Sequence, residues 1–148
     1  MQNRREFCHG LVIASIASAF EACGGGSSTG PSTLPALTAV SAAVSAGKIN
    51  LNVDSNSPLS AVGSAAVVQT PSGSFLIART AQSSFTALTA VCTHEGCTID
   101  EYQSGTYECS CHGSQFSTSG SVVRGPAASP LRQFATSYAS PTLTIAVA

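Results

Sequence analysis

Apolar and polar side chains alternate in several short segments after residue 47. In KINLNV the apolar side chains of Ile49, Leu51 and Val53 fall on one face, which is typical of a half-buried strand. Residues 63–70 and 74–80 are mainly apolar and flank the turn sequence TPSG, so together they predict a β-hairpin.

Two later segments extend this pattern. Residues 84–91 predict a strand that runs directly into Cys92. At the C-terminus, Leu143, Ile145 and Val147 alternate with small or polar residues and predict a closing strand. Because no long segment after the N-terminal leader carries an apolar stripe at helical spacing, we expect a mostly β domain with turns rich in Gly, Ser and Pro.

The first 22 residues have the layout of an export signal, in which a basic start is followed by an apolar stretch and then small residues. Arg4 and Arg5 precede the apolar stretch 10–20, which is shorter than the about 20 residues that cross a bilayer. The sequence RREF resembles the twin-arginine export motif, and an ordinary secretory signal is the alternative. We expect this segment to form a short signal helix.

Residues 23–35 form a predicted tether. Cys23 is followed by Gly, Ser, Thr and Pro, which resembles the lipid-modified cysteine and flexible linker of bacterial lipoproteins. Glu21 stands where such signals usually have a small residue, so a cleaved signal or an uncleaved short anchor is the alternative. The remaining residues, 36–148, are the predicted folded domain.

Composition narrows the class of protein. The 148 residues carry a net charge of −1 and only 9% are charged, whereas nucleic-acid binding requires clustered Lys and Arg. A hydrophobic content of 43% indicates a folded chain rather than a disordered one.

The candidate chemistry is concentrated in the window from Cys92 to Phe116, which holds four of the six cysteines and two of the three histidines. Cysteine and histidine at close spacing serve structural zinc sites, disulfide frameworks or iron–sulfur centres. A zinc site with two Cys and two His leaves two cysteines unexplained, and a disulfide framework leaves both histidines unexplained. Four metal ligands with one disulfide account for all six residues.

Two boxes in this window carry a family resemblance. CTHEGC (residues 92–97) and CSCHGS (residues 109–114) are similar to the two cluster-binding boxes of Rieske iron–sulfur proteins. The sequence GPAASPL (residues 125–131) resembles the proline-containing loop that covers the cluster in that family. The resemblance implies an antiparallel β-sandwich with a loop-built cluster-binding part at about residues 91–131, and one [2Fe-2S] cluster per chain.

The resemblance also assigns roles by position. Cys92 and Cys109 resemble the thiolate ligands of one iron, and His94 and His112 resemble the imidazole ligands of the other. Ser114 matches a serine whose hydroxyl donates to a bridging sulfur of the cluster, which stabilises the reduced state.

Cys97 and Cys111 resemble the disulfide that joins the two loops in the high-potential branch of the family. A disulfide suits an exported protein, because the cytosol tends to keep thiols reduced. A cluster assembled in the cytoplasm must be exported in a folded protein, which favours the twin-arginine interpretation of the leader.

Two positions depart from the family. Phe116 stands where the highest-potential members have a tyrosine that donates to a cysteine sulfur, so we expect a lower potential. Glu95 stands where quinol-oxidising members typically have an apolar residue. Arg124 and Arg132 lie near the proline-containing loop in sequence and are candidates for neutralising nearby acidic groups.

We therefore expect a one-electron carrier outside the cytoplasmic membrane, in the periplasm or tethered to the membrane, with a redox partner such as a c-type cytochrome. The alternative is a small electron-transfer subunit of a larger oxidoreductase, similar to arsenite oxidase or a quinol–cytochrome c reductase complex. A zinc-binding structural module is the remaining alternative. A catalytic oxygenase chain would need two further histidines, and the folded domain has none to spare.

Overall fold

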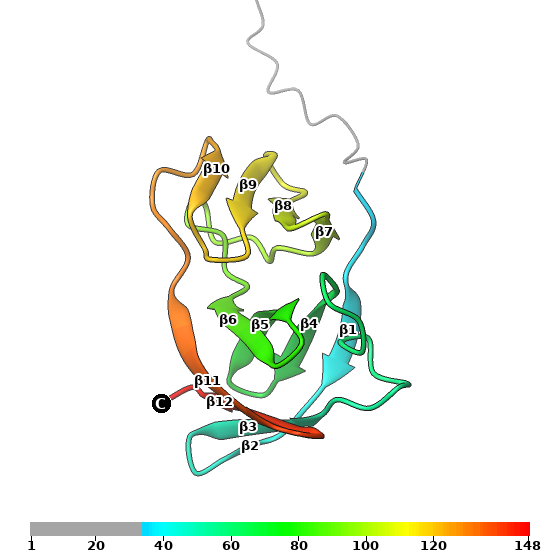
Figure 1. Cartoon of the computed structure of the whole chain (residues 1–148). Helices are drawn as coiled ribbons and strands as arrows, with labels where there is room; N and C mark the ends of the chain where they lie inside the picture. Colours follow the sequence, from blue (N-terminus) through cyan, green and yellow to red (C-terminus); the bar gives the residue numbers. More distant parts are fainter. Residues whose placement is uncertain (1–33) are drawn as a thin grey trace, which may run out of the picture.

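The computed structural model describes residues 34–148, and all regular elements within that range are β-strands (Figure 1). They are β1 (Thr38–Ser41), β2 (Val44–Ser45), β3 (Lys48–Asn52), β4 (Ala65–Thr70), β5 (Gly73–Ala81), β6 (Ser84–Thr89), β7 (Glu101–Gln103), β8 (Thr106–Cys109), β9 (Ser114–Ser117), β10 (Val122–Arg124), β11 (Gln133–Ala139) and β12 (Thr142–Ala146). The predicted signal helix and Cys23 lie outside the described residues. Between residues 34 and 148 there is no helix of the length and apolarity needed to cross a membrane.

The strands predicted from alternation are present. In β3 the side chains of Ile49 and Leu51 are buried while their neighbours are exposed, as the sequence pattern indicates. The predicted hairpin is the β4–β5 pair, and β12 closes the domain between β11 and β3. The strand expected over residues 84–91 is β6, which ends at Thr89.

The larger sheet has eight strands in the order β1-β4-β5-β6-β11-β12-β3-β2. It curls at β11, because Gln133 and Phe134 pair with β6 whereas Ala135–Ala139 pair with β12. In Figure 1 the strands β3, β11 and β12 cross below β4–β6. The two halves enclose a core that includes Ile77 and Ile145, both fully buried.

One pair departs from the antiparallel expectation, since β1 and β4 are parallel. The chain between them passes through β2 and β3 at the far edge of the same sheet before it returns. A parallel pair requires such a crossover, whereas two residues suffice for an antiparallel hairpin.

The smaller sheet has four antiparallel strands in the order β10-β9-β8-β7 and lies above β4–β6 (Figure 1). The central strands are therefore covered on both faces. Within β5, Ile77 packs against the lower layer and Leu76 against the upper one. This double burial explains the continuous apolar run from Phe75 to Ala78, since a strand buried on both faces has no polar face to maintain.

The sequence pattern assigned the Cys/His window to loops, and the structure adds strands there. β7, β8 and most of β9 lie within it. Residues 35–37 run along the free edge of β7, where the Leu37 N–H donates to the Asp100 carbonyl (2.7 Å) and the Tyr102 N–H donates to the Pro35 carbonyl (3.0 Å). This segment then leads into β1, so it links the smaller sheet to the larger one.

Candidate metal centre

The two sequence boxes form two loops of similar geometry. Loop 1 (residues 92–97) is closed by a bridge between Val91 and Thr98, and loop 2 (residues 109–114) lies between the paired ends of β8 and β9. In each loop the N–H of a glycine donates to the carbonyl of the first cysteine, from Gly96 in loop 1 and from Gly113 in loop 2 (both 2.9 Å).

Both glycines have positive φ values, 77° at Gly96 and 73° at Gly113. This is the left-handed region that glycine adopts at little cost. A Cβ at either position would meet no described atom within 4 Å. The backbone turn, rather than a shortage of space, therefore requires glycine in both loops.

A disulfide between Cys97 and Cys111 joins the loops, with a Cα–Cα distance of 6.5 Å. The pairing implied by the family resemblance is confirmed. The sulfurs of Cys97, Cys109 and Cys111 lie within 4.8 Å of one another, but the disulfide removes two of them as metal ligands.

The two remaining thiols, Cys92 and Cys109, are free and only 3% and 2% exposed. Burial raises the pKa of the Cys109 thiol to about 11, opposed by backbone N–H groups of loop 2 and reinforced by the neighbouring Cys92 thiol. A metal that binds these sulfurs must displace protons, because the thiolate is the ligand.

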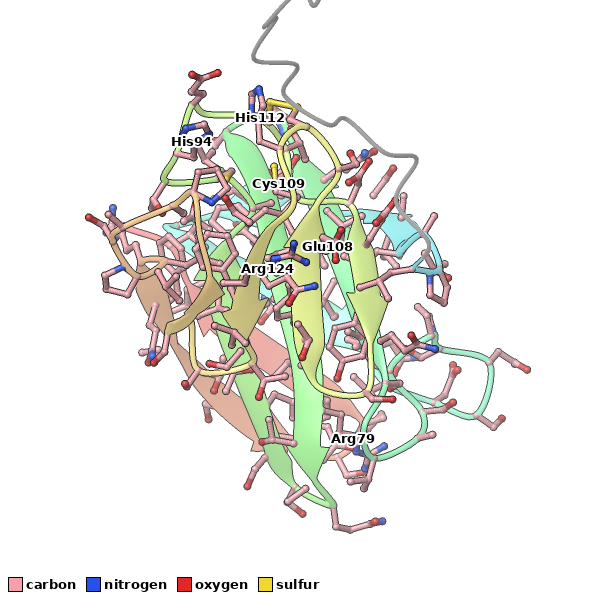
Figure 2. All side chains as sticks on the ribbon, turned by 90° about the horizontal axis from the view of Figure 1, so that it is seen from above. Arg79, His94, Glu108, Cys109, His112 and Arg124 are labelled. Carbon is pink, nitrogen blue, oxygen red and sulfur yellow. A yellow bond between two sulfur atoms is a disulfide. The ribbon has the colours of Figure 1, made fainter. Side chains whose placement is uncertain are left out.

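The imidazoles of His94 and His112 come from different loops and meet edge to face, with ring centroids 4.9 Å apart at an interplanar angle of 86°. Figure 2 shows both rings at one end of the molecule, with Cys109 close by. The Nε2 atoms face the carboxylate of Glu95, which lies 3.9 Å from His94 and 3.7 Å from His112.

On the opposite side of its ring, the Nδ1 atom of His94 is buried and has no hydrogen-bond partner within the described part of the chain. A buried polar atom without a partner is costly, and such atoms in native proteins usually have an explanation. A metal ion ligated through Nδ1 would supply such an explanation.

The proline-containing loop (residues 125–131) is hydrogen-bonded to both loop 1 and loop 2. The backbone N–H of Ala127 donates to the hydroxyl oxygen of the fully buried Ser114 (3.0 Å). The Thr93 hydroxyl donates to the Ser129 carbonyl (2.6 Å). Because the Ser114 oxygen accepts from Ala127, its own proton remains available to another acceptor.

Two contacts and one buried hydroxyl were not anticipated from the sequence. Thr93 lies in the first box, but its partner is 36 residues away. Asp100 accepts from the hydroxyl of Ser110 in loop 2 (2.9 Å). The Tyr107 hydroxyl is buried without a hydrogen-bond partner in the described structure, and burial raises its pKa above the ordinary value. Only the folded pairing of distant segments creates these contacts, and no local pattern signals them.

The two arginines lie in different environments. The Arg132 guanidinium carbon is 4.7 Å from the centre of the Phe134 ring, on the larger sheet. Figure 2 shows Arg124 next to Glu108 on the outer face of the smaller sheet. The register places Gln115 between the strands that carry them, and its amide donates to Glu108 (2.7 Å). Of the two arginines, Arg124 is therefore the one whose positive charge lies next to an acidic side chain of the site-bearing sheet, that of Glu108.

Phe116 is fully buried and faces Tyr107 across the β8–β9 pair. Its ring belongs to the core between the two sheets. Glu95, by contrast, has a side chain that is 61% exposed. The two departures from the family pattern thus occupy opposite environments, one in the core and one at the surface of the site.

Comparison with known proteins agrees with this geometry. The Rieske [2Fe-2S] domain model matches residues 51–135, more than half of the chain. A 46-residue stretch is 50% identical to the chloroplastic cytochrome b6-f complex iron-sulfur subunit of Bigelowiella natans, covering 30% of this chain and 18% of that subunit. Most of that relative thus has no counterpart in the match.

Two solved structures have a similar fold. The cyanobacterial plasma membrane Rieske protein PetC3 from Synechocystis PCC 6803 gives a TM-score of 0.53 at 30% identity, covering 64% of this chain and 97% of that one. The ferredoxin of carbazole 1,9a-dioxygenase from Nocardioides aromaticivorans IC177 gives 0.53 at 18% identity, covering 66% and 96%. The latter supports the fold alone.

The chain belongs to the Rieske [2Fe-2S] domain family. Its cofactor is accordingly a [2Fe-2S] cluster. The donors present fit that cofactor: two buried thiols and two imidazoles lie where the loops meet, and the Nδ1 atom of His94 has no hydrogen-bond partner among residues 34–148. Family membership favours iron and sulfide over zinc, which accepts the same donor types.

Proposed function

We propose that this chain is a one-electron carrier that works outside the cytoplasmic membrane. Cys92 and Cys109 would hold one iron, and His94, through its Nδ1 atom, and His112 would hold the other. The orphaned Nδ1 of His94 carries this assignment, because Nε2 of the same ring faces solvent and Glu95 instead. When bound, a cluster with two neutral imidazoles in place of thiolates accepts an electron at a potential of roughly −150 to +300 mV.

The two ligand pairs differ in exposure, and this difference defines the direction of electron exit. The thiols are buried under the loops, whereas the His94 and His112 side chains are 27% and 35% exposed. A redox partner can therefore approach the imidazole edges but not the sulfurs. The Ser114 hydroxyl, oriented by the Ala127 N–H, is proposed to donate to a sulfur of the cluster.

The purified full-length protein tests the assignment. We expect iron and acid-labile sulfide in equal amounts and a Rieske-type paramagnetic signal after reduction. Cys109→Ser should lose both iron and signal, while Ser110→Ala, one residue away, should retain them. Zinc without iron, or a Cys109→Ser protein that keeps its full signal, would contradict the proposal.

The proposed location rests on the leader and the disulfide. A disulfide between Cys97 and Cys111 supports an oxidising compartment. We infer that Arg4 and Arg5 direct twin-arginine export of the folded protein. Replacing both with Lys should leave the protein in the cytoplasm in a fractionation experiment, and Cys23→Ser should release it from membranes if Cys23 is lipidated.

A second function is supported by the relative from the cytochrome b6-f complex, namely a subunit of a larger oxidoreductase. Purification of the tagged chain from its native membranes distinguishes the two. An isolated carrier purifies alone, whereas a subunit brings a stoichiometric partner with it.

A further inference from the structure

The charged side chains of the described chain are unevenly distributed along the sequence. The part that holds the site, residues 91–131, carries four carboxylates and a single arginine, namely Glu95, Asp100, Glu101, Glu108 and Arg124. The rest of the described chain carries three basic groups and one carboxylate, namely Lys48, Arg79, Arg132 and Asp54. The site-bearing part is therefore net acidic, and the remaining described part is net basic.

Figure 2 shows where some of these charged groups lie relative to the imidazoles. His94 and His112 lie at one end, and Arg79 lies at the opposite end. The Arg124 side chain, the basic group within the site-bearing part, lies beside Glu108 rather than at the imidazole end. The basic groups that Figure 2 labels therefore lie away from the imidazole end, from which the electron leaves.

Glu95 stands at that exit. Each oxygen of its carboxylate faces a different imidazole, Oε1 at 3.9 Å from Nε2 of His94 and Oε2 at 3.7 Å from Nε2 of His112. Since its side chain is 61% exposed, a partner that approaches the imidazole edges meets this carboxylate. Asp100, held by the Ser110 hydroxyl of loop 2, adds a second exposed carboxylate beside the site.

We propose that Glu95 is a specificity-determining residue and that the physiological redox partner presents a cationic face to the imidazole end. This inference rests on the proposed function, because it requires electrons to pass at that end. A positively charged partner is drawn to the Glu95 carboxylate and arrives already oriented toward the exposed imidazoles. Complementary potentials of this kind mainly raise the association rate and reject partners of the wrong sign.

The test is stopped-flow oxidation of the reduced full-length protein by two small oxidants of opposite charge, tris(phenanthroline)cobalt(III) and ferricyanide, over a range of ionic strength. A c-type cytochrome with a lysine-rich haem edge is the macromolecular probe. Reduction potentials of all variants are measured, so that rates are compared at equal driving force. The variants are Glu95→Gln and Glu95→Lys.

Asp54→Asn is the matched control. It removes the same charge, but Asp54 lies outside the site-bearing part, in the turn after β3, where its carboxylate accepts hydrogen bonds from Asn52 and Asn56. If only the net charge matters, Asp54→Asn and Glu95→Gln will have equal effects. If the position of the charge matters, only Glu95→Gln will change the rates.

We expect the rate with the cobalt complex and with the basic cytochrome to fall as salt is added, and the rate with ferricyanide to rise. At low salt, Glu95→Gln should slow oxidation by the basic cytochrome by about fivefold, the order expected for one contact between unit charges in water, and should slow oxidation by the trivalent cobalt complex as well. Glu95→Lys should reverse the preference, and Asp54→Asn should leave the rates nearly unchanged.

Identical salt dependence for both oxidants, or equal effects of Glu95→Gln and Asp54→Asn, would overturn the inference while leaving the electron-carrier function intact. A protein with no iron–sulfur signal, or one that neither oxidant reoxidises, would instead overturn the proposed function itself. The two failures are thus distinguishable in one set of measurements.

Discussion

The larger sheet and the site-bearing part are stabilised by different means. The larger sheet closes on a core made from its own strands, with Ile49, Ile77 and Ile145 fully buried. The core under the site is shared: five of its twelve buried residues come from β4–β6 and the residue that follows them, namely Val67, Leu76, Ala78, Leu88 and Ala90.

The site-bearing part therefore depends on the central strands of the larger sheet for much of its core. Its four strands are three or four residues long, and half-exposed side chains alternate with buried ones in β8 and β9. Its own strands bury few apolar side chains, so we expect other bonds to stabilise it. These are the disulfide between Cys97 and Cys111 and the metal bonds of the four proposed ligands. Changes in the two regions should accordingly have unequal consequences.

The largest effect is expected from the core of the larger sheet. Ile145→Ala should lower the free energy of unfolding by about 2–5 kcal/mol, because it leaves a cavity at a fully buried position. Both regions should unfold earlier, since the site-bearing part rests on this sheet. Urea titrations followed by far-UV circular dichroism and by the visible band of the cluster would check this. If the visible band disappears at the same urea concentration as in the wild type, the site-bearing part does not depend on this core.

Removing the disulfide should destabilise the site-bearing part and leave the larger sheet unchanged. The double change Cys97→Ala and Cys111→Ala releases a crosslink with a sequence separation of 14, for which the loop-closure cost is about 3 kcal/mol. We expect the visible band to disappear at lower urea concentration while the transition of the larger sheet keeps its midpoint. Equal shifts of both transitions would show that the two regions unfold as one unit.

A smaller effect is expected at Phe116. Phe116→Tyr adds a hydroxyl donor on the inward face of β9 that also carries Ser114, and a donor to the cluster stabilises its reduced state. The potential should rise by about 40 mV for each ~1 kcal/mol of preference for the reduced state. Equilibrium redox titration measures it, with Phe116→Leu as a control. An unchanged potential in the tyrosine variant would refute this expectation.

The smallest effect is expected at Tyr107, directly across from Phe116. Its hydroxyl is buried without a partner in the described structure, so Tyr107→Phe removes a desolvated polar group. We expect the free energy of unfolding to stay the same or to rise by up to about 1 kcal/mol. A clear destabilisation in the holoprotein would mean that this hydroxyl has a partner in the cluster-bound protein.

Much of the larger sheet could be predicted from local sequence. The alternation of Ile49 and Leu51 fixed the buried face of β3, and the turn at Pro71 and Gly73 fixed the β4–β5 hairpin. β7 and β10 could not be predicted, because strands of three residues with partly exposed side chains leave no periodic signal. The parallel pairing of β1 with β4 could not be predicted either, because nothing in the residues of β1 specifies a partner that is distant in the sequence.

The sequence by itself determined the candidate chemistry of this protein: its cysteines and histidines lie in two boxes that resemble those of the Rieske family, and the resemblance implies both the cluster and the disulfide. Only the tertiary structure decided that one carboxylate, Glu95, faces imidazoles from two different loops, at the end of the molecule where those imidazoles are exposed. The reason is physical. Ligand identity is a property of single residues, whereas an electrostatic field depends on where residues distant in the chain come together.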